Sequence, residues 1–141
     1  MLSQPLEQAS ACQTTTQQSI LIVEDDPSLA DVLSIRLKTQ GFQTTIADRG
    51  QLGLTLARTD KPHLILLDLC LPDMDGFTVC QQLADEEETS EIPVIIVSGM
   101  ERPDIVRRCR AAGCRYFIRK PYDPNALLTL IRQAIDEAEA A

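Results

Sequence analysis

The sequence predicts an α/β fold in which a parallel five-stranded sheet is covered by helices on both faces. Two observations carry this prediction. From Ser19 onward, short apolar runs alternate with helix-like segments, and the central runs are apolar without interruption. Alternating strands and helices are typical of parallel sheets, because each parallel pair needs a crossover that a helix usually supplies. Uninterrupted apolar strands are expected where helices bury both faces of the sheet.

Five short runs are the expected strands. Three of them, at Ile20–Val23, Leu64–Leu67 and Val94–Val97, consist entirely of apolar residues. The run Phe42–Ala47 is more polar and therefore suits an edge of the sheet, where one side faces water. The run Tyr116–Ile118 is also weaker and completes the set of five βα units.

Helices are expected between these strands, and their ends carry recognisable signals. Asp26-Pro27 and Asp123-Pro124 each combine a capping side chain with a proline in the first turn. Glycine is favoured just after the last turn, because it adopts the left-handed conformation there. The expected helices run from Asp26-Pro27 to Gly41, over residues 50–60, through Phe77–Ala84, from Ile105 to Gly113, and from Asp123-Pro124 to Ala138.

Length and composition predict one globular domain. The chain has 141 residues, of which 44% are hydrophobic, and this is enough to build a single core. We assign residues 1–18, rich in Gln, Ser and Thr, to a flexible polar tail and residues 19–141 to the folded domain. No apolar run reaches the roughly 20 residues of a membrane helix. The first 19 residues also lack the bases and the apolar block of a secretory signal. We therefore expect a cytoplasmic protein without membrane contact.

Charge and cysteine content exclude further classes of function. The formal net charge is −8, from 21 acids and 13 bases, which argues against nucleic acid as a direct partner because phosphates require a basic surface. The five cysteines are odd in number and show no C-x-x-C pair, and we assign no role to the single histidine, His63. Neither a structural zinc site nor a disulfide framework is expected.

Polar side chains stand at the carboxyl ends of four predicted strands. Glu24 and Asp25 follow the first strand, Asp68 the third, Ser98 the fourth and Lys120 the fifth. Because the carboxyl ends of parallel strands meet at one edge of the sheet, we expect these groups to share a pocket. Asp68 is the hardest to explain structurally, because it follows four buried positions directly.

Such a pocket predicts a metal-assisted reaction of phosphoryl groups. Carboxylates brought together repel one another unless a cation lies between them. Mg²⁺, or Mn²⁺ in its place, prefers oxygen ligands and suits a site with few carboxylates and several waters. Lys120 adds a positive charge and Ser98 a hydroxyl. Around one carboxylate these groups would hold a phosphoryl group, with Asp68 as the nucleophile.

Four motifs in combination resemble the receiver domain of bacterial response regulators, the phosphoacceptor module of two-component signalling. They are "ILIVEDDPSL", "LILLDLCLPDMDGF", "PVIIVSG" and "FIRKPYD", and the resemblance covers about residues 19 to 138. It implies a flavodoxin-like (βα)5 fold with strand order 2-1-3-4-5. The sequence stops one helix after Lys120, so it resembles either a single-domain, chemotaxis-regulator-like receiver or a fragment of a longer regulator.

The resemblance implies a role for each residue of the pocket. Asp68 would accept a phosphoryl group from a sensor histidine kinase or a histidine phosphotransfer protein. Asp25 and Asp68 would bind Mg²⁺ directly, together with the backbone carbonyl of Cys70. Glu24 would reach the metal through water, and Lys120 would pair with Asp68 or with its phosphoryl oxygens.

Ser98 and Phe117 are implied as switch residues. Ser98 would move to hydrogen-bond the phosphoryl group, and Phe117 stands at the aromatic switch position, three residues before Lys120. The surface of the fourth helix, fifth strand and fifth helix would then change and bind an unidentified downstream protein. Many transcription-factor receivers carry two acids for dimer salt bridges where this chain has Arg115 and Tyr116, so a homodimer is a weaker expectation. The Lys120-Pro121 bond is a candidate for the cis form.

Other classes of protein stay open. A receiver-like scaffold would bind partners without phosphorylation, and the complete set of acids, hydroxyl and lysine argues against it. An aspartyl-phosphate phosphatase of the haloacid dehalogenase type usually has an acid two residues after its nucleophile, where this chain has Cys70. A flavin-binding flavodoxin is least favoured, because three acids stand where its phosphate loop would lie. We therefore expect a signalling phosphoacceptor that assists its own phosphorylation and dephosphorylation, and not an enzyme.

Overall fold

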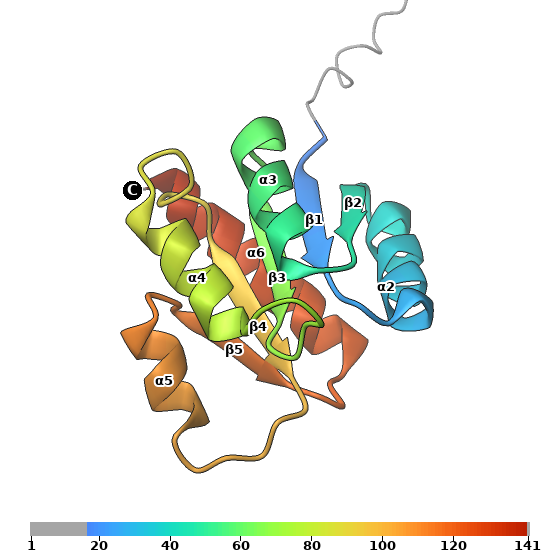
Figure 1. The fold of residues 1–141 in the computed structure, drawn as a ribbon. Coiled ribbons are helices and arrows are strands. Elements are labelled where there is room, and N and C mark those ends of the chain that lie inside the picture. The colour runs from blue at the N-terminus through green and yellow to red at the C-terminus, as the bar shows by residue number, and fades with distance from the viewer. Residues whose placement is uncertain (1–16, 141) are drawn as a thin grey trace, which may run out of the picture.

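The computed structural model describes residues 17–140 and contains five parallel strands (Figure 1). They are β1 (Ser19–Val23), β2 (Gln43–Ala47), β3 (Leu64–Asp68), β4 (Val94–Ser98) and β5 (Tyr116–Arg119). Their order in the sheet is β2-β1-β3-β4-β5, and every neighbouring pair is parallel. The predicted fold class and strand order are confirmed. The predicted tail, apart from residues 17 and 18, lies outside the described residues.

Between residues 17 and 140, five helices connect and cover the strands. They are α2 (Pro27–Thr39), α3 (Gly50–Asp60), α4 (Gly76–Asp85), α5 (Ile105–Ala111) and α6 (Pro124–Ala140). Buried side chains of α3, α4 and α5 form one core cluster with one face of the sheet, and those of α2 and α6 form a second cluster with the other face. Figure 1 shows this division, with α3, α4 and α5 in front of the sheet and α6 behind it. The sheet is therefore doubly covered, as predicted.

Coverage of both faces explains the character of the strands. Successive side chains of a strand point to opposite faces, so Ile65 and Leu67 of β3 enter the first cluster while Leu64 and Leu66 enter the second. All five residues of β3 are buried. In β2 only the last residue, Ala47, is buried, which agrees with its predicted place at the edge of the sheet.

The capping signals act as the sequence indicates. Oδ1 of Asp26 accepts hydrogen bonds from the N–H groups of Ser28 at 2.9 Å and Leu29 at 3.3 Å, and α2 begins at the intervening proline. The main chain after α2 and α5 turns at Gly41 and Gly113, whose φ angles are 95° and 94°. These values are left-handed, and glycine adopts them without steric cost.

Other features lie away from the carboxyl edge of the sheet. His63 accepts a hydrogen bond at Nδ1 from the N–H of Ser19, 3.0 Å away, and so links the beginnings of β1 and β3. Cys80, Cys109 and Cys114 are buried in the first core cluster. None of the helices between residues 17 and 140 combines the length and the apolar composition that crossing a membrane requires.

Candidate functional site

Three acidic side chains converge where β1 and β3 end. Asp68 is the last residue of β3, and Glu24 and Asp25 directly follow β1. One carboxylate oxygen from each of the three lies within 4.8 Å of those of the other two. Glu24 and Asp68 are buried, with exposed fractions of 8% and 9%, whereas Asp25 is exposed. Parallel pairing of β1 and β3 therefore brings together the acids that the sequence singled out.

Lys120 lies between two of these acids. Its Nζ donates a hydrogen bond to Oε1 of Glu24 at 3.1 Å and lies 3.6 Å from Oδ2 of Asp68. Partial burial favours the neutral amine, yet the charges of Asp68 and Glu24 outweigh it and hold the pKa of Lys120 above its ordinary value. The resemblance implies that Lys120 pairs with Asp68 or with its phosphoryl oxygens. The structure shows a shorter contact with Glu24, which no local pattern indicates.

Opposing influences act on the pKa of Glu24. Burial is the largest influence on its pKa and raises it, and the nearby charge of Asp68 acts in the same direction. The N–H of Asp26, which donates to Oε2 at 3.1 Å, and the ammonium group of Lys120 oppose this rise. The net pKa of Glu24 is raised. An additional cation beside these carboxylates would relieve their repulsion.

Cys70 presents its backbone to Asp68. The N–H of Cys70 donates to Oδ1 of Asp68 at 3.3 Å, a contact that the sequence did not predict. Burial, followed by the charge of Asp68, raises the pKa of the Cys70 thiol, so the side chain stays neutral. The residue therefore contributes its main-chain N–H to the site.

Ser98 ends β4 beside the acidic cluster. Its side chain is buried, and its Oγ accepts a hydrogen bond from the N–H of Met100 at 3.0 Å. The backbone carbonyl of Ser98 accepts from the N–H of Lys120 at 2.9 Å, which joins the end of β4 to the residue after β5. The hydroxyl therefore lies at the junction between the pocket and the loop that leads to α5.

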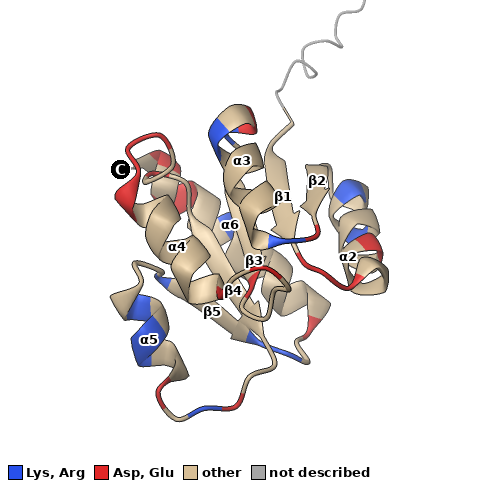
Figure 2. Ribbon diagram, viewed as in Figure 1, with Lys and Arg blue, Asp and Glu red and all other residues tan. Residues whose placement is uncertain are grey.

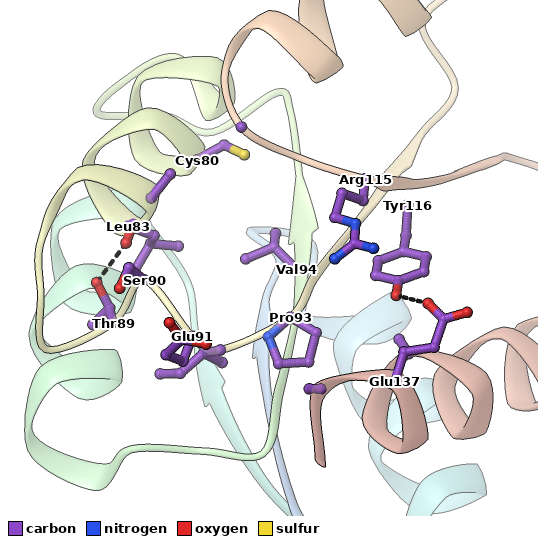
Figure 3. Close-up of a pocket in the computed structure, with 15 residues that line it drawn as sticks. Cys80, Leu83, Thr89, Ser90, Glu91, Pro93, Val94, Arg115, Tyr116 and Glu137 are labelled. Atoms are coloured by element: carbon purple, nitrogen blue, oxygen red, sulfur yellow. Dashed lines mark hydrogen bonds between the residues drawn. The ribbon is translucent and has the colours of Figure 1, made fainter. Parts of the chain in front are cut away.

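The two aromatic residues of β5 point to opposite faces of the sheet, as predicted. Phe117 is half-buried against the core cluster of α3, α4 and α5, and Tyr116 packs against the cluster of α2 and α6. The hydroxyl of Tyr116 hydrogen-bonds the carboxylate of Glu137 on α6 (Figure 3). The Lys120-Pro121 peptide bond is cis, which confirms that prediction.

Two cavities differ in their relation to the acids. A groove of about 450 Å³ runs along α2 and opens onto Asp68 and Lys120, and its walls include Leu29 and Val32, which are 49% and 52% exposed. A smaller cavity of about 140 Å³ is lined by Cys80 of α4, by residues 89–94 and by Tyr116, and no member of the acidic cluster lines it (Figure 3). Of these two cavities, the α2 groove is the one that adjoins Asp68 and Lys120.

Comparison with known proteins places this geometry in one family. The family model of the response regulator receiver domain matches residues 20–132. The chain is 38% identical over 113 residues to the transcriptional regulator RpaA of Synechocystis, covering 80% of this chain and 47% of that protein. It is 36% identical to protein PilH of Pseudomonas aeruginosa over 116 residues, covering 82% and 96%. The chain thus spans about half the length of RpaA and nearly all of PilH.

Solved structures agree with this placement. A CheY-like receiver domain protein from Methanospirillum hungatei superimposes with a TM-score of 0.83 and 29% identity, covering 89% of this chain and 98% of that one. The receiver domain of the sensor histidine kinase PA1611 from Pseudomonas aeruginosa gives a TM-score of 0.79 and 25% identity, covering 86% and 99%. That receiver holds a magnesium ion in its active-site cleft.

Proposed function

Because this chain belongs to the response regulator receiver family, we propose that Asp68 accepts a phosphoryl group from a phosphohistidine in an Mg²⁺-dependent transfer. The observation that carries this proposal is the cluster of Glu24, Asp25 and Asp68, with Nζ of Lys120 3.6 Å from the Asp68 carboxylate. A carboxylate oxygen of Asp68 would attack phosphorus as the bond to the histidine nitrogen breaks. The electrons of the P–N bond would return to that nitrogen, and with a proton on the other ring nitrogen the products would be an aspartyl phosphate and a neutral imidazole on the donor.

The ligands of the cluster fit a hard divalent cation such as Mg²⁺ or Mn²⁺. All of them are oxygens, and three carboxylates around one ion leave room for the waters that Mg²⁺ retains. Asp25, Asp68 and the carbonyl of Cys70 would hold the ion directly, and Glu24 would hold it through water. A bound ion would neutralise charge on the phosphoryl oxygens. Lys120 would exchange its contact with Glu24 for one of those oxygens, and by the same contacts the site would assist later hydrolysis.

The donor would be a sensor histidine kinase or a histidine phosphotransfer protein acting in the cytoplasm. Its histidine has to reach a buried carboxylate, and the α2 groove opens onto that carboxylate between exposed apolar side chains. Leu29 and Val32 are exposed on the walls of this groove, and a helix of the donor would cover their apolar side chains. This supports approach of the donor along α2.

The receiver would signal through the surface of α5, β5 and α6. Figure 2 shows basic residues, drawn in blue on the ribbon, along α5 in a chain whose net charge is −8. Arg107 and Arg110 are exposed, and neither lies within 4.0 Å of a carboxylate in the part of the chain that the structure describes. Such a surface favours an acidic protein partner. A second copy of this chain is a weaker candidate, because like charges would face one another.

Magnesium should stabilise the protein through Asp25. Because Mg²⁺ would bind only the folded cluster, the gain in free energy of unfolding follows RT ln(1 + [L]/Kd) and reaches about 2.7 kcal/mol at a hundred times Kd. Melting temperatures measured along a Mg²⁺ titration should therefore rise in the native protein and stay nearly constant in Asp25→Ala. Asp26→Asn, which retains an oxygen for capping α2, serves as a control and should keep the rise. An equal rise in Asp25→Ala would remove Asp25 from the ligand set.

Phosphorylation of Asp68 should change the structure at distant residues, and Ser98 should transmit this change. A serine hydroxyl that accepts a bond from Met100 can also donate its own proton to a phosphoryl oxygen, and this would draw the β4–α5 loop inward. Backbone amide shifts should change on phosphorylation over residues 98 to 119. Ser98→Ala should still take up the phosphoryl group but show smaller distant changes, whereas the exposed Ser90→Ala should behave as the native protein. Changes confined to residues around Asp68 in the native protein would instead indicate a phosphoryl relay or sink.

A further inference from the structure

The helix α3 begins without a cap of its own. Arg49 stands at the capping position and makes no side-chain hydrogen bond to the helix. The first N–H groups of a helix have no partner within the helix, so they require one from elsewhere. Asp73, from the β3–α4 loop (residues 69–75), provides it. Its Oδ1 accepts from the N–H of Gly50 at 2.7 Å and its Oδ2 from the N–H of Gln51 at 2.9 Å.

A second contact holds the β3–α4 loop against α3. Met74 lies against Gly50 so closely that a Cβ added to this glycine would be 2.4 Å from Cγ and 2.7 Å from Sδ of the methionine. Two consecutive loop residues therefore hold the first turn of α3, one by hydrogen bonds and one by packing. The positive end of the helix dipole favours the Asp73 carboxylate, and the N–H groups of Gln51 and Gly50 hold its pKa below the usual range.

The other end of this loop touches the phosphoacceptor. Cys70 donates its N–H to Asp68 and forms an isolated antiparallel bridge with Asp75. The N–H of Gly76 donates a hydrogen bond to the carbonyl of Leu69 at 3.0 Å, which closes the loop at its base. The anchor at Asp73 is thus three residues from the main-chain groups of Cys70 and five from the carboxylate they face. Any shift of the anchor would be passed on over this short distance.

We propose that Asp73 is a positioning residue for phosphoryl transfer, holding the β3–α4 loop on α3 so that the N–H and carbonyl of Cys70 face Asp68 and its metal. This inference rests on the proposed function, because it assigns Asp73 to the same site. Groups that orient a metal ligand without touching the metal commonly change metal affinity by about 10- to 100-fold when they are removed. A cap that merely stabilised α3 would have no such effect on the metal.

The test compares the Mg²⁺ dependence of Asp68 labelling by acetyl phosphate in the native protein, Asp73→Ala and Asp73→Asn. In Asp73→Ala we expect the Mg²⁺ concentration for half-maximal labelling to rise about 10-fold, with the rate at saturating Mg²⁺ nearly unchanged. Asparagine has one acceptor oxygen where aspartate has two, so Asp73→Asn should lie between the other two proteins. Asp48→Asn removes an exposed, ion-paired charge next to the same helix and should match the native protein.

Melting temperatures without Mg²⁺ separate positioning from stability. Unchanged Mg²⁺ dependence in Asp73→Ala, together with a lowered melting temperature, would overturn the positioning role and leave only a helix cap. An equal loss of Mg²⁺ affinity in Asp48→Asn would overturn it as well, because the effect would then be one of charge. Absence of labelling in the native protein is a different failure, since it would refute the proposed function and the positioning role together. If Asp73→Ala does not fold, the intermediate Mg²⁺ dependence of Asp73→Asn decides the question.

Discussion

Asp68→Asn is expected to abolish phosphoryl uptake while leaving the fold intact. The amide has nearly the shape of the carboxylate but lacks the negative oxygen that would attack phosphorus. It also removes one charge from a crowded acidic cluster, so stability should not fall. Intact-mass measurement after incubation with acetyl phosphate and Mg²⁺ should show one acid-stable, base-labile phosphoryl group on the native protein and none on the variant. Removal of Mg²⁺ by EDTA should have the same effect as the substitution.

Asp75→Asn is the matched control for this experiment. Asp75 lies in the same loop, but its Oδ1 caps α4 by accepting from the N–H of Phe77 at 2.9 Å, and asparagine retains that oxygen. This variant should be labelled like the native protein. Labelling of Asp68→Asn would exclude Asp68 as the acceptor. A native protein that takes up no phosphoryl group would instead favour the scaffold, and one that releases phosphate continuously would favour the phosphatase.

Gly76→Ala should lower the free energy of unfolding more than a glycine-to-alanine substitution at any other glycine of the site. A Cβ at this position would lie 2.5 Å from the Cα of Leu69 and 2.8 Å from the carbonyl oxygen of Asp68. Both atoms are main chain, so no side chain can turn away to make room. Overpacking of this kind typically costs 1–3 kcal/mol, and with backbone on both sides we expect about 2–3 kcal/mol. Urea unfolding measures the difference directly.

Gly99→Ala provides the comparison at the residue that follows Ser98. The atom nearest to a Cβ added at Gly99 would be the Cβ of Lys120, at 3.7 Å, which is an ordinary van der Waals contact. Its free energy of unfolding should differ little from that of the native protein. Equal stabilities of the two variants would show that the loop relaxes easily around Gly76. A rigid loop, by contrast, agrees with the anchoring of its centre by Asp73.

Much of the fold could be predicted because local signals agreed with the tertiary arrangement. The helix expected to start at Asp26-Pro27 begins at Pro27, and the one expected at Asp123-Pro124 begins at Pro124. The strand expected at Leu64–Leu67 is extended in the structure only by Asp68. Capping chemistry and uninterrupted apolar runs are determined by neighbouring residues, so the sequence displays them directly. Boundaries without such signals are less well predicted: β2 begins one residue later than expected, at Gln43, and α6 ends two residues later, at Ala140.

The contacts that organise the site could not be predicted in the same way. The bond from Lys120 to Glu24 joins residues 96 positions apart, and the cap that Asp73 provides to α3 crosses 23 positions. From the sequence we therefore expected Lys120 to pair with Asp68 and assigned no role to Asp73. The Nζ of Lys120 lies 3.1 Å from Glu24 and 3.6 Å from Asp68. The actual placement of the strands is needed to decide which of these two distances is the shorter.

The amino-acid sequence alone identifies which chemical groups stand at the carboxyl ends of the strands, because those groups follow apolar runs that have to be buried in a parallel sheet. It also determined the fold class, through the alternation of strands and helices. The packing of the whole domain is needed to show which of these groups touch, and that Cys70 and Asp73 link Asp68 to α3. The reason is physical. Burial and capping act between neighbours in the chain, whereas a hydrogen bond across the pocket depends on distances that every strand and helix of the sheet sets together.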